Sequence, residues 1–195
     1  MKYHKQKGFT LIEMVAVLGI FMVLTSIVIF NYSKFRSDTI LTNMAYEVAL
    51  TIREAQIYGV SARSSGASFE NAYGIFIPSS SATQYSVFSD TSGDLIFSGD
   101  SCLLSGGDNC TTTYNFQNNI KISQLDVKIG SSCQPASSLS ISFKRPNPEP
   151  IIRRNSGNEA ISLAQIKVST AEGVSRYVVI YGNGQVAVLN ESQCN

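Results

Sequence analysis

The sequence Gly8-Phe9-Thr10-Leu11-Ile12-Glu13 begins a long apolar run, which continues as MVAVLGIFMVLTSIVIF and ends at Phe30. From Phe9 to Phe30 the chain has 22 residues and one charge, Glu13. At 1.5 Å per residue a helix of this length is about 33 Å long, enough to cross a bilayer core of roughly 30 Å. The run therefore predicts a membrane-spanning helix.

The residues ahead of the run predict its orientation. Lys2, Lys5 and Lys7 precede it, with no acidic residue among them. Cationic flanks stay on the cytoplasmic side of a membrane. We therefore expect a single-pass protein of the cytoplasmic (inner) membrane, with its N-terminus inside and the rest of the chain exported.

Glu13 is unusual within such a span. A carboxylate in a membrane helix costs about 2.5–3.5 kcal/mol on insertion scales and persists mainly where a partner or a function holds it. No Lys or Arg of the span can pair with it. A free α-amino group on a neighbouring copy could do so if the chain were cut just before Phe9.

The segment Lys7-Gly8-Phe9-Thr10-Leu11-Ile12-Glu13 resembles the class III leader of type IV prepilins and type II secretion pseudopilins. The resemblance implies cleavage after Gly8 by a prepilin peptidase, N-methylation of Phe9 by its methyltransferase activity, and pairing of Glu13 with that amine on an adjacent subunit. It also implies other pilin or pseudopilin subunits and an inner-membrane assembly platform as partners. The alternatives are an ordinary signal anchor and a secretory signal peptide, but the latter is cut after its apolar region.

The chain divides into four expected regions: a cleaved leader at 1–8, an assembly helix at 9–30, an amphipathic continuation at 31–65 and a β-rich exported head at 66–195. A continuous helix is expected from about Thr10 to Arg63, ended by Ser64-Ser65-Gly66. Its exported half keeps one face apolar at three- and four-residue steps. These positions are Leu41, Met44, Val48, Ile52, Ala55 and Gly59.

Beyond the helix the apolar period changes to two, which predicts short strands. Gly182-Asn183-Gly184 is a tight-hairpin signal between the last two of them. A single long helix followed by eight or nine strands indicates an α+β fold with an antiparallel sheet packed on the helix. The expected strands are 73–77, 84–88, 94–97, 112–116, 120–129, 139–144, 161–169, 175–181 and 185–189.

Two further segments resemble the GspH/FimT type of minor pseudopilin or minor pilin. They are the helical stretch Leu50 to Gln56 with Ser61-Ala62-Arg63, and the hairpin stretch Arg176 to Val186. This resemblance implies a pilin-like fold.

Four cysteines lie on the exported side, where oxidation is the rule, so disulfides are expected. They are Cys102, Cys110, Cys133 and Cys194, which allow three pairings. A 102–110 pair would close a small loop and a 133–194 pair would tie the tail to the head, but the sequence does not choose between pairings. A zinc site is the alternative to disulfides, but it is disfavoured because no CxxC spacing occurs and the one histidine, His4, lies in the leader.

No catalytic set can be assembled, because the chain after the leader lacks histidine and its serines cluster in turn-like runs. We therefore expect neither an enzyme nor a cofactor or metal. The acidic pairs Asp90 with Asp94 and Asp100 with Asp108 sit beside Gly and Ser, and we interpret them as solvated turn residues rather than a calcium site. After cleavage the chain would carry 12 basic and 14 acidic residues, a balance that indicates no strongly polyanionic partner.

One region concentrates positive charge, the proline-rich stretch from Lys144 to Arg154, which we interpret as an exposed, stiff loop between strands. Some relatives in pili of competent bacteria are DNA receptors, and this resemblance implies an alternative function as a DNA-binding minor pilin. The phosphate contacts would then be Lys144, Arg145, Arg153 and Arg154. Glu149 dilutes the patch and the stretch has no aromatic residue to stack on bases, so a solvated loop is favoured.

The sequence thus predicts a structural subunit, a minor pilin or pseudopilin. It would be processed, anchored through Phe9–Phe30, and built into a type II secretion pseudopilus or a type IV pilus.

Overall fold

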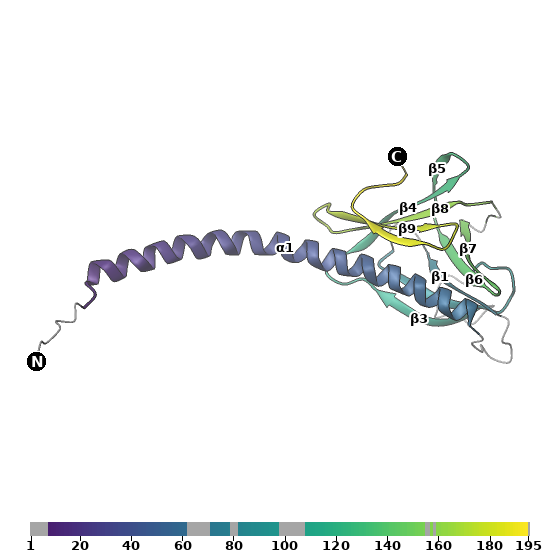
Figure 1. Cartoon of the computed structure of the whole chain (residues 1–195), viewed down its shortest axis with the longest axis horizontal. Helices are drawn as coiled ribbons and strands as arrows, with labels where there is room; N and C mark the ends of the chain where they lie inside the picture. Colours follow the sequence, from purple (N-terminus) through teal and green to yellow (C-terminus); the bar gives the residue numbers. More distant parts are fainter. Residues whose placement is uncertain are drawn as a thin grey trace, which may run out of the picture. The chain divides into compact units, whose positions relative to one another are not determined.

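The computed structural model describes residues 8–61, 71–78, 82–97, 108–154, 157 and 159–194 of the chain. The chain forms two compact units, Met1–Thr39 and Ile40–Asn195, which we call the anchor unit and the head. Helix α1, Leu11–Val60, contributes residues to both units (Figure 1). The expected helix end at Ser64-Ser65-Gly66 lies outside the described residues.

The anchor unit contains a stretch of α1, Leu11–Ile29, that is long and apolar enough to cross a membrane, with a mean hydropathy of 2.5 and no part buried. Its two hydroxyl residues are satisfied within the helix. The Thr25 hydroxyl donates to the Phe21 carbonyl oxygen over 2.8 Å, and the Ser26 hydroxyl donates to that of Met22 over 2.9 Å. In a lipid surrounding these bonds would remove the cost of exposing unpaired hydroxyls.

The described part of the head forms ten strands, and their bounds are β1 Ala72–Ile77, β2 Gln84–Asp90, β3 Asn109–Asn115, β4 Lys121–Ile129, β5 Ser132–Pro135, β6 Leu139–Lys144, β7 Asn147–Arg154, β8 Leu163–Ser169, β9 Ser175–Tyr181 and β10 Val186–Leu189. They make two five-stranded sheets. The first sheet has the order β3-β2-β1-β6-β7 and the second β10-β9-β8-β4-β5. All strand pairs are antiparallel, which confirms the α+β expectation.

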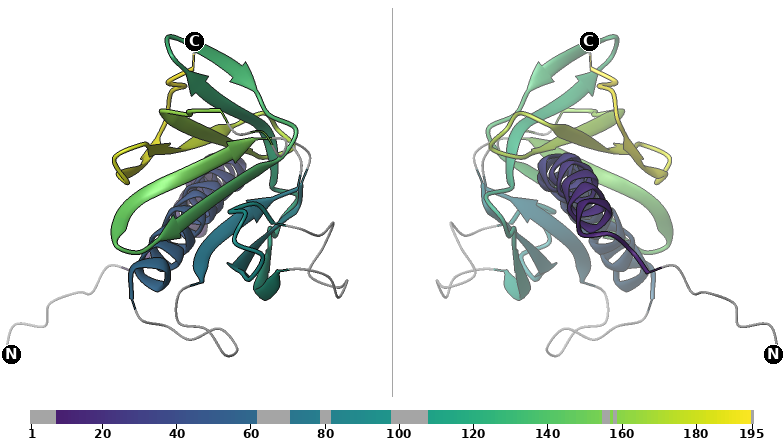
Figure 2. Two further views of the ribbon diagram at one scale, coloured as in Figure 1. Left: turned by 90° about the vertical axis from the view of Figure 1, so that its right-hand side faces the viewer. Right: turned by 90° about the vertical axis from the view of Figure 1, so that its left-hand side faces the viewer.

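The core of the head lies where the two sheets meet one face of α1 (Figure 2). The predicted apolar stripe is confirmed, because Leu41, Val48, Ile52 and Ala55 are fully buried. Each sheet turns alternate residues toward this face, as the period of two requires. The inward residues include Ile75, Val87 and Ile141 from the first sheet, and Leu125, Ile166, Val178 and Ile180 from the second.

Gly59 marks the closest approach of α1 to the first sheet. A Cβ atom at this position would lie 2.4 Å from the carbonyl oxygen of Phe143 on β6. No side chain fits such a gap, so glycine here is a packing requirement of the fold.

The strand expected at 94–97 is wrong, because residues 91–96 form a succession of bends. Leu95 lies in the left-handed region with φ of 64°, which a strand does not allow. The bend is organised by Asp90, whose carboxylate accepts hydrogen bonds from the amides of Gly93 (2.6 Å) and Leu95 (3.0 Å). The interpretation of Asp90 as a solvated turn residue is therefore also wrong, since it is 2 % exposed.

Two strands were not expected. The proline-rich stretch interpreted as a loop contains β7. Pro148 and Pro150 are tolerated there because β7 is an edge strand, in which a residue without an amide N–H can face away from the neighbouring strand. The other is β5, only four residues long and also at an edge. The predicted head is thus correct in class, and it consists of two sheets rather than one.

Candidate functional site

The residues of the predicted processing site precede α1. Gly8, Phe9 and Thr10 are exposed and lie outside the helix, which begins at Leu11. A Cβ atom on Gly8 would meet no atom within 4 Å. The fold of this chain therefore makes no steric demand for glycine at position 8.

Thr10 and Glu13 form a reciprocal cap at the start of α1. The Glu13 amide donates to the Thr10 hydroxyl oxygen, and the Thr10 amide donates to the Glu13 carboxylate, each over 3.3 Å. The Thr10 hydroxyl also contacts that carboxylate at 3.3 Å. This is a capping box, which satisfies amides that the first helical turn leaves unpaired. The sequence reasoning missed it, although the Thr-x-x-Glu spacing is its signature.

A disulfide joins Cys133 on β5 to Cys194 near the end of the chain, with 5.5 Å between their Cα atoms. Cys110 on β3 is also disulfide-bonded. Cys102 lies outside the described residues, so the predicted 102–110 pair stays a prediction.

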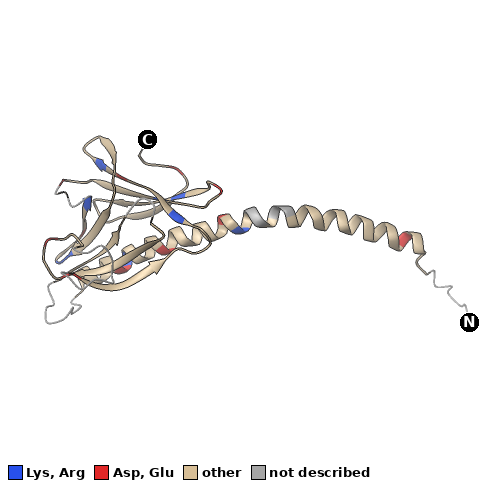
Figure 3. Ribbon diagram, turned by 180° about the vertical axis from the view of Figure 1, so that it is seen from behind, with Lys and Arg blue, Asp and Glu red and all other residues tan. Residues whose placement is uncertain are grey.

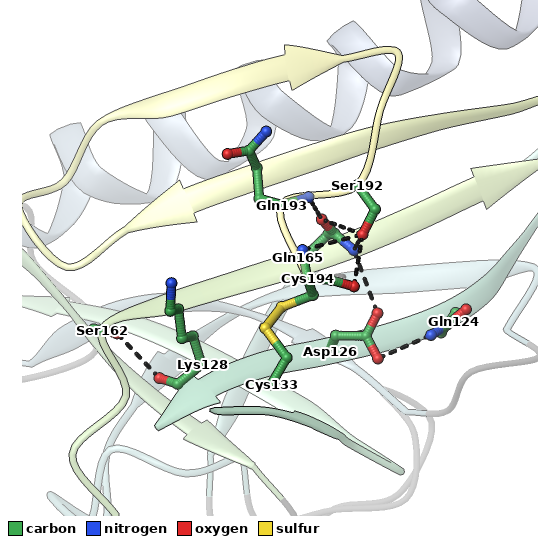
Figure 4. Close-up of a disulfide and its surroundings, with 9 residues drawn as sticks. All are labelled: Gln124, Asp126, Lys128, Cys133, Ser162, Gln165, Ser192, Gln193 and Cys194. Atoms are coloured by element: carbon green, nitrogen blue, oxygen red, sulfur yellow. Dashed lines mark hydrogen bonds between the residues drawn. A yellow bond between two sulfur atoms is a disulfide. The ribbon is translucent and has the colours of Figure 1, made fainter. Parts of the chain in front are cut away.

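The disulfide holds the C-terminal residues over the outer face of the second sheet (Figure 4). Gln165 on β8, 1 % exposed, accepts a hydrogen bond from the Gln193 amide over 2.6 Å and donates one to the Ser192 hydroxyl oxygen over 3.0 Å. It also donates to the carboxylate of buried Asp126 on β4 over 3.3 Å. Gln124 donates a second bond to that carboxylate over 3.0 Å. The tail thus completes a buried polar network.

Three acidic side chains of the first sheet and its connections come together. Asp90, Asp94 and Asp108 place carboxylate oxygens within 4.8 Å of one another, while Asp100 lies outside the described residues. Backbone amides bind each of them: Thr91 donates to Asp108 over 3.0 Å, and Ile96 donates to Asp94 over 3.0 Å. The carboxylates act here as caps of the bends that follow β2.

The four basic residues predicted as a DNA patch are divided between the two ends of β7. Lys144 pairs with Asn147 at the turn, next to Arg145, whereas Arg153 and Arg154 lie opposite Ser140 and Leu139. The first and last residues of β7 lie about 23 Å apart along the strand, so the two pairs of basic residues are well separated. Described Lys and Arg positions are likewise scattered over the head (Figure 3).

Arg154 is also engaged by an acidic neighbour. It forms an ion pair with Glu159 at 2.6 Å, and their hydrogen bond lowers the pKa of Glu159 and raises the pKa of Arg154. The structure therefore does not gather a single basic surface, and DNA contact by these residues stays a prediction.

The two head segments that resemble minor pseudopilins meet in space. Arg53 on α1 donates to the Gly184 carbonyl oxygen at the tip of the β9–β10 hairpin and to the Gln56 side chain. Gln56 donates to the Pro148 carbonyl oxygen on β7 over 2.7 Å. One turn of α1 thus holds an edge of each sheet.

Comparison with known proteins gives one family. Residues 3–29 match the family described as the prokaryotic N-terminal methylation motif. Neither the curated proteins nor the solved structures contained a match to the chain. The matched segment contains the predicted processing site, the capping box and the whole membrane-length stretch. The chain thus carries a leader of the type IV pilin class, which implies processing by prepilin peptidase and assembly with other pilins.

Proposed function

We propose that the chain is a minor subunit of a type IV pilus or a type II secretion pseudopilus, of the GspH/FimT type. The observation that carries the proposal is the methylation-motif match at residues 3–29. Prepilin peptidase cuts after Gly8, the new amine of Phe9 is methylated, and the Leu11–Ile29 helix anchors the subunit with its N-terminus inside. The genes beside this one distinguish a secretion machine from a pilus.

Gly8 is the small residue that the resemblance places before the cut. The fold itself does not demand glycine there, because a Cβ atom would meet nothing within 4 Å. We expect the mature protein to begin at Phe9, and Gly8→Glu to leave it uncut. Intact mass spectrometry of the membrane-extracted protein measures both, with Gly19→Ala as the control, because that position is also free of contacts. A wild-type N-terminus still at Met1 would exclude the proposal.

Glu13 is expected to act in assembly. It lies four residues after Phe9, about 6 Å along a helix, so in a staggered bundle it can meet the amine of the next copy. A buried pair of this kind offsets the desolvation of both charges only in the correct register, so it specifies register. Since a subunit at the very tip has no copy above it, the presence of Glu13 favours a position below the tip.

The capping box allows the charge of Glu13 to be tested apart from its helix cap. Glutamine also serves at the third position of a capping box, so Glu13→Gln keeps the cap and loses the charge, whereas Glu13→Val loses both. Thr10→Val weakens the cap and keeps the charge. All three should insert and be cleaved, and both Glu13 variants should be absent from sheared filaments that Thr10→Val still enters.

The opposite pattern contradicts the pairing mechanism. If Glu13→Gln joins filaments as wild type does while Glu13→Val and Thr10→Val do not, the carboxylate acts only as a cap. Membrane fractionation, N-terminal mass and co-purification with filaments measure the successive steps.

A further inference from the structure

Three exposed side chains follow directly after the apolar stretch of α1. Tyr32 is 64 % exposed and Phe35 is 71 % exposed, and Arg36 is exposed as well. All three belong to the anchor unit, and neither aromatic ring joins the described core of the head. They lie beyond residue 29, where the match to the methylation motif ends. We call Tyr32, Phe35 and Arg36 the interface cluster.

The interface cluster occupies one face of α1. Its members are at positions i, i+3 and i+4, which are neighbours on the surface of a helix. In the described part of the chain, no side chain pairs with the Arg36 guanidinium. Lys34, within the same turn, is the first charged residue after Glu13. The cluster therefore marks the point where the helix changes from uniformly apolar to aromatic and cationic.

Its distance from the apolar stretch places the interface cluster at the membrane surface. At 1.5 Å per residue, Tyr32 lies about 4.5 Å and Arg36 about 10.5 Å beyond Ile29 along the helix. The headgroup layer adds about 5–8 Å to each side of the hydrocarbon core of a bilayer. Helical side chains lean toward the N-terminus of their helix, here toward the bilayer, so both rings and the guanidinium reach this layer.

We propose that the interface cluster binds the phospholipid headgroups on the exported face of the membrane. The Tyr32 ring lies at the boundary between acyl chains and headgroups, which accommodates both its apolar body and its polar hydroxyl, and Phe35 packs beside it. The Arg36 guanidinium donates to a lipid phosphate, whose oxygens match its planar fork. This inference rests on the proposed function, because it requires the Leu11–Ile29 helix to span the membrane.

Continuity with the membrane-length stretch favours lipid over other occupants. The stretch that ends at Ile29 has no buried part, so lipid surrounds it while the subunit is in the membrane. Side chains one or two turns further along the same helix meet the headgroups of that bilayer before any other partner. A neighbouring subunit can cover the interface cluster only where it displaces these lipids.

The depth of the interface cluster can be measured directly, because the chain contains no tryptophan and a single introduced one reports only its own site. The full chain is placed in nanodiscs of phosphatidylcholine that carries a nitroxide quencher either at the headgroup or near the end of an acyl chain. For Tyr32→Trp and for Phe35→Trp, the headgroup quencher should lower the fluorescence about twofold more than the acyl-chain quencher does. Both side chains are exposed, so the replacements do not disturb packing.

Two controls on the same helix define the scale. Phe21→Trp lies within the apolar stretch and should be quenched more by the acyl-chain label, whereas Tyr46→Trp lies in the head and should respond mainly to a quencher dissolved in water. If the acyl-chain label does not quench Phe21→Trp, the helix does not span the bilayer and the proposed function fails. If Phe21→Trp behaves as expected while Tyr32→Trp and Phe35→Trp respond as Tyr46→Trp does, only this inference is overturned.

The phosphate contact is tested by combining Tyr32→Trp with Arg36→Gln or Arg36→Lys. Arg36→Gln should reduce the preference of the tryptophan for the headgroup quencher about twofold, because the helix loses its bond to the phosphates, whereas Arg36→Lys keeps a cation there and should retain most of it. Lys121→Gln at the exposed start of β4 is the matched control and should change nothing. An unchanged preference in Arg36→Gln, or an equal reduction in Lys121→Gln, overturns the phosphate contact.

Discussion

The guanidinium of Arg53 donates a hydrogen bond to the carbonyl oxygen of Gly184 over 3.0 Å, joining residues that are 131 positions apart. The same side chain donates to Gln56 over 2.9 Å, and Gln56 in turn donates to the Pro148 carbonyl oxygen. These bonds connect α1 to the second sheet and to the first. The relative placement of the sheets in the head therefore depends on one helical turn as well as on apolar packing.

Arg53→Ala should lower the free energy of unfolding of the head by about 1.5–3 kcal/mol, because a charge-assisted bond is lost and the Gly184 carbonyl loses its partner. Arg53→Lys should recover only part of this, since an ammonium group does not reproduce the planar fork. Denaturant titration measures both, with Lys121→Ala at the exposed start of β4 as control. A loss no larger than that of Lys121→Ala would show that the hydrogen bonds of Arg53 do not stabilise the head.

Gly59→Ala should destabilise the head by about 1–3 kcal/mol, although alanine favours helices, because its Cβ atom would be forced against the Phe143 carbonyl oxygen. The matched control is Gly19→Ala, where an added Cβ meets nothing within 4 Å. Thermal unfolding of the two variants gives the comparison. Equal midpoints for both would mean that α1 moves away from β6 at no cost.

The Cys133→Ser, Cys194→Ser double variant should lose about 4 kcal/mol of stability, the value expected for opening a loop of this size. The tail should also leave Gln165 and Asp126 open to water, because their partners at Ser192 and Gln193 are no longer held in place. Denaturant titration measures the first effect, and hydrogen exchange at the Gln193 amide the second. A protected Gln193 amide in the variant would show that the polar network holds the tail without the disulfide.

Burial raises the pKa of Tyr85 above its ordinary value of 10.0. A group with a raised folded-state pKa contributes stability that is complete below its unfolded-state pKa and is lost as the pH rises past it. The head should therefore lose stability from about pH 10 upward. Tyr85→Phe should cost about 1 kcal/mol at pH 7, through its lost hydrogen bond to Thr51, and should flatten this alkaline loss.

Unfolding curves between pH 7 and 11 test this, and the control is Tyr46→Phe, which removes the hydroxyl of an exposed tyrosine on α1. An alkaline loss that is equally steep in Tyr85→Phe would assign the effect to other groups.

The parts of the structure that the sequence predicts are those with a local periodic cause. The apolar stretch to Ile29, the buried stripe through Val48 and Ile52, and the Gly182–Gly184 hairpin each follow from spacing alone. Separation into two sheets has no such cause, because β1 pairs with β6 far along the chain. Pro148 and Pro150 predict a loop, and only the position of β7 at the edge of the first sheet explains how they fit a strand.

For the candidate site, the processing motif could be predicted from the sequence because its residues are consecutive. The Thr-x-x-Glu spacing of the capping box also lies in consecutive residues, but the charge of Glu13 within an apolar run predicts a partner outside the chain and not the bond to Thr10 that the structure shows. The exposed apolar side chains of α1 were not predicted either, because the apolar stripe of an amphipathic helix is expected on its buried face. The exposure of Leu50 and Ile57 shows that apolar residues also lie outside that stripe.

The Cys133–Cys194 disulfide also determines how the protein responds to a pulling force. The segment between these residues, 61 positions apart, contains strands β6 to β10 and lies within a covalent loop. If the head were stretched from its C-terminal end, the covalent path of the load would pass from Cys194 directly to Cys133 on β5, and the backbone of those five strands could not be extended. The disulfide therefore prevents about 200 Å of extended chain from being released when the head unfolds. A subunit under tension can therefore lengthen only through residues that precede Cys133.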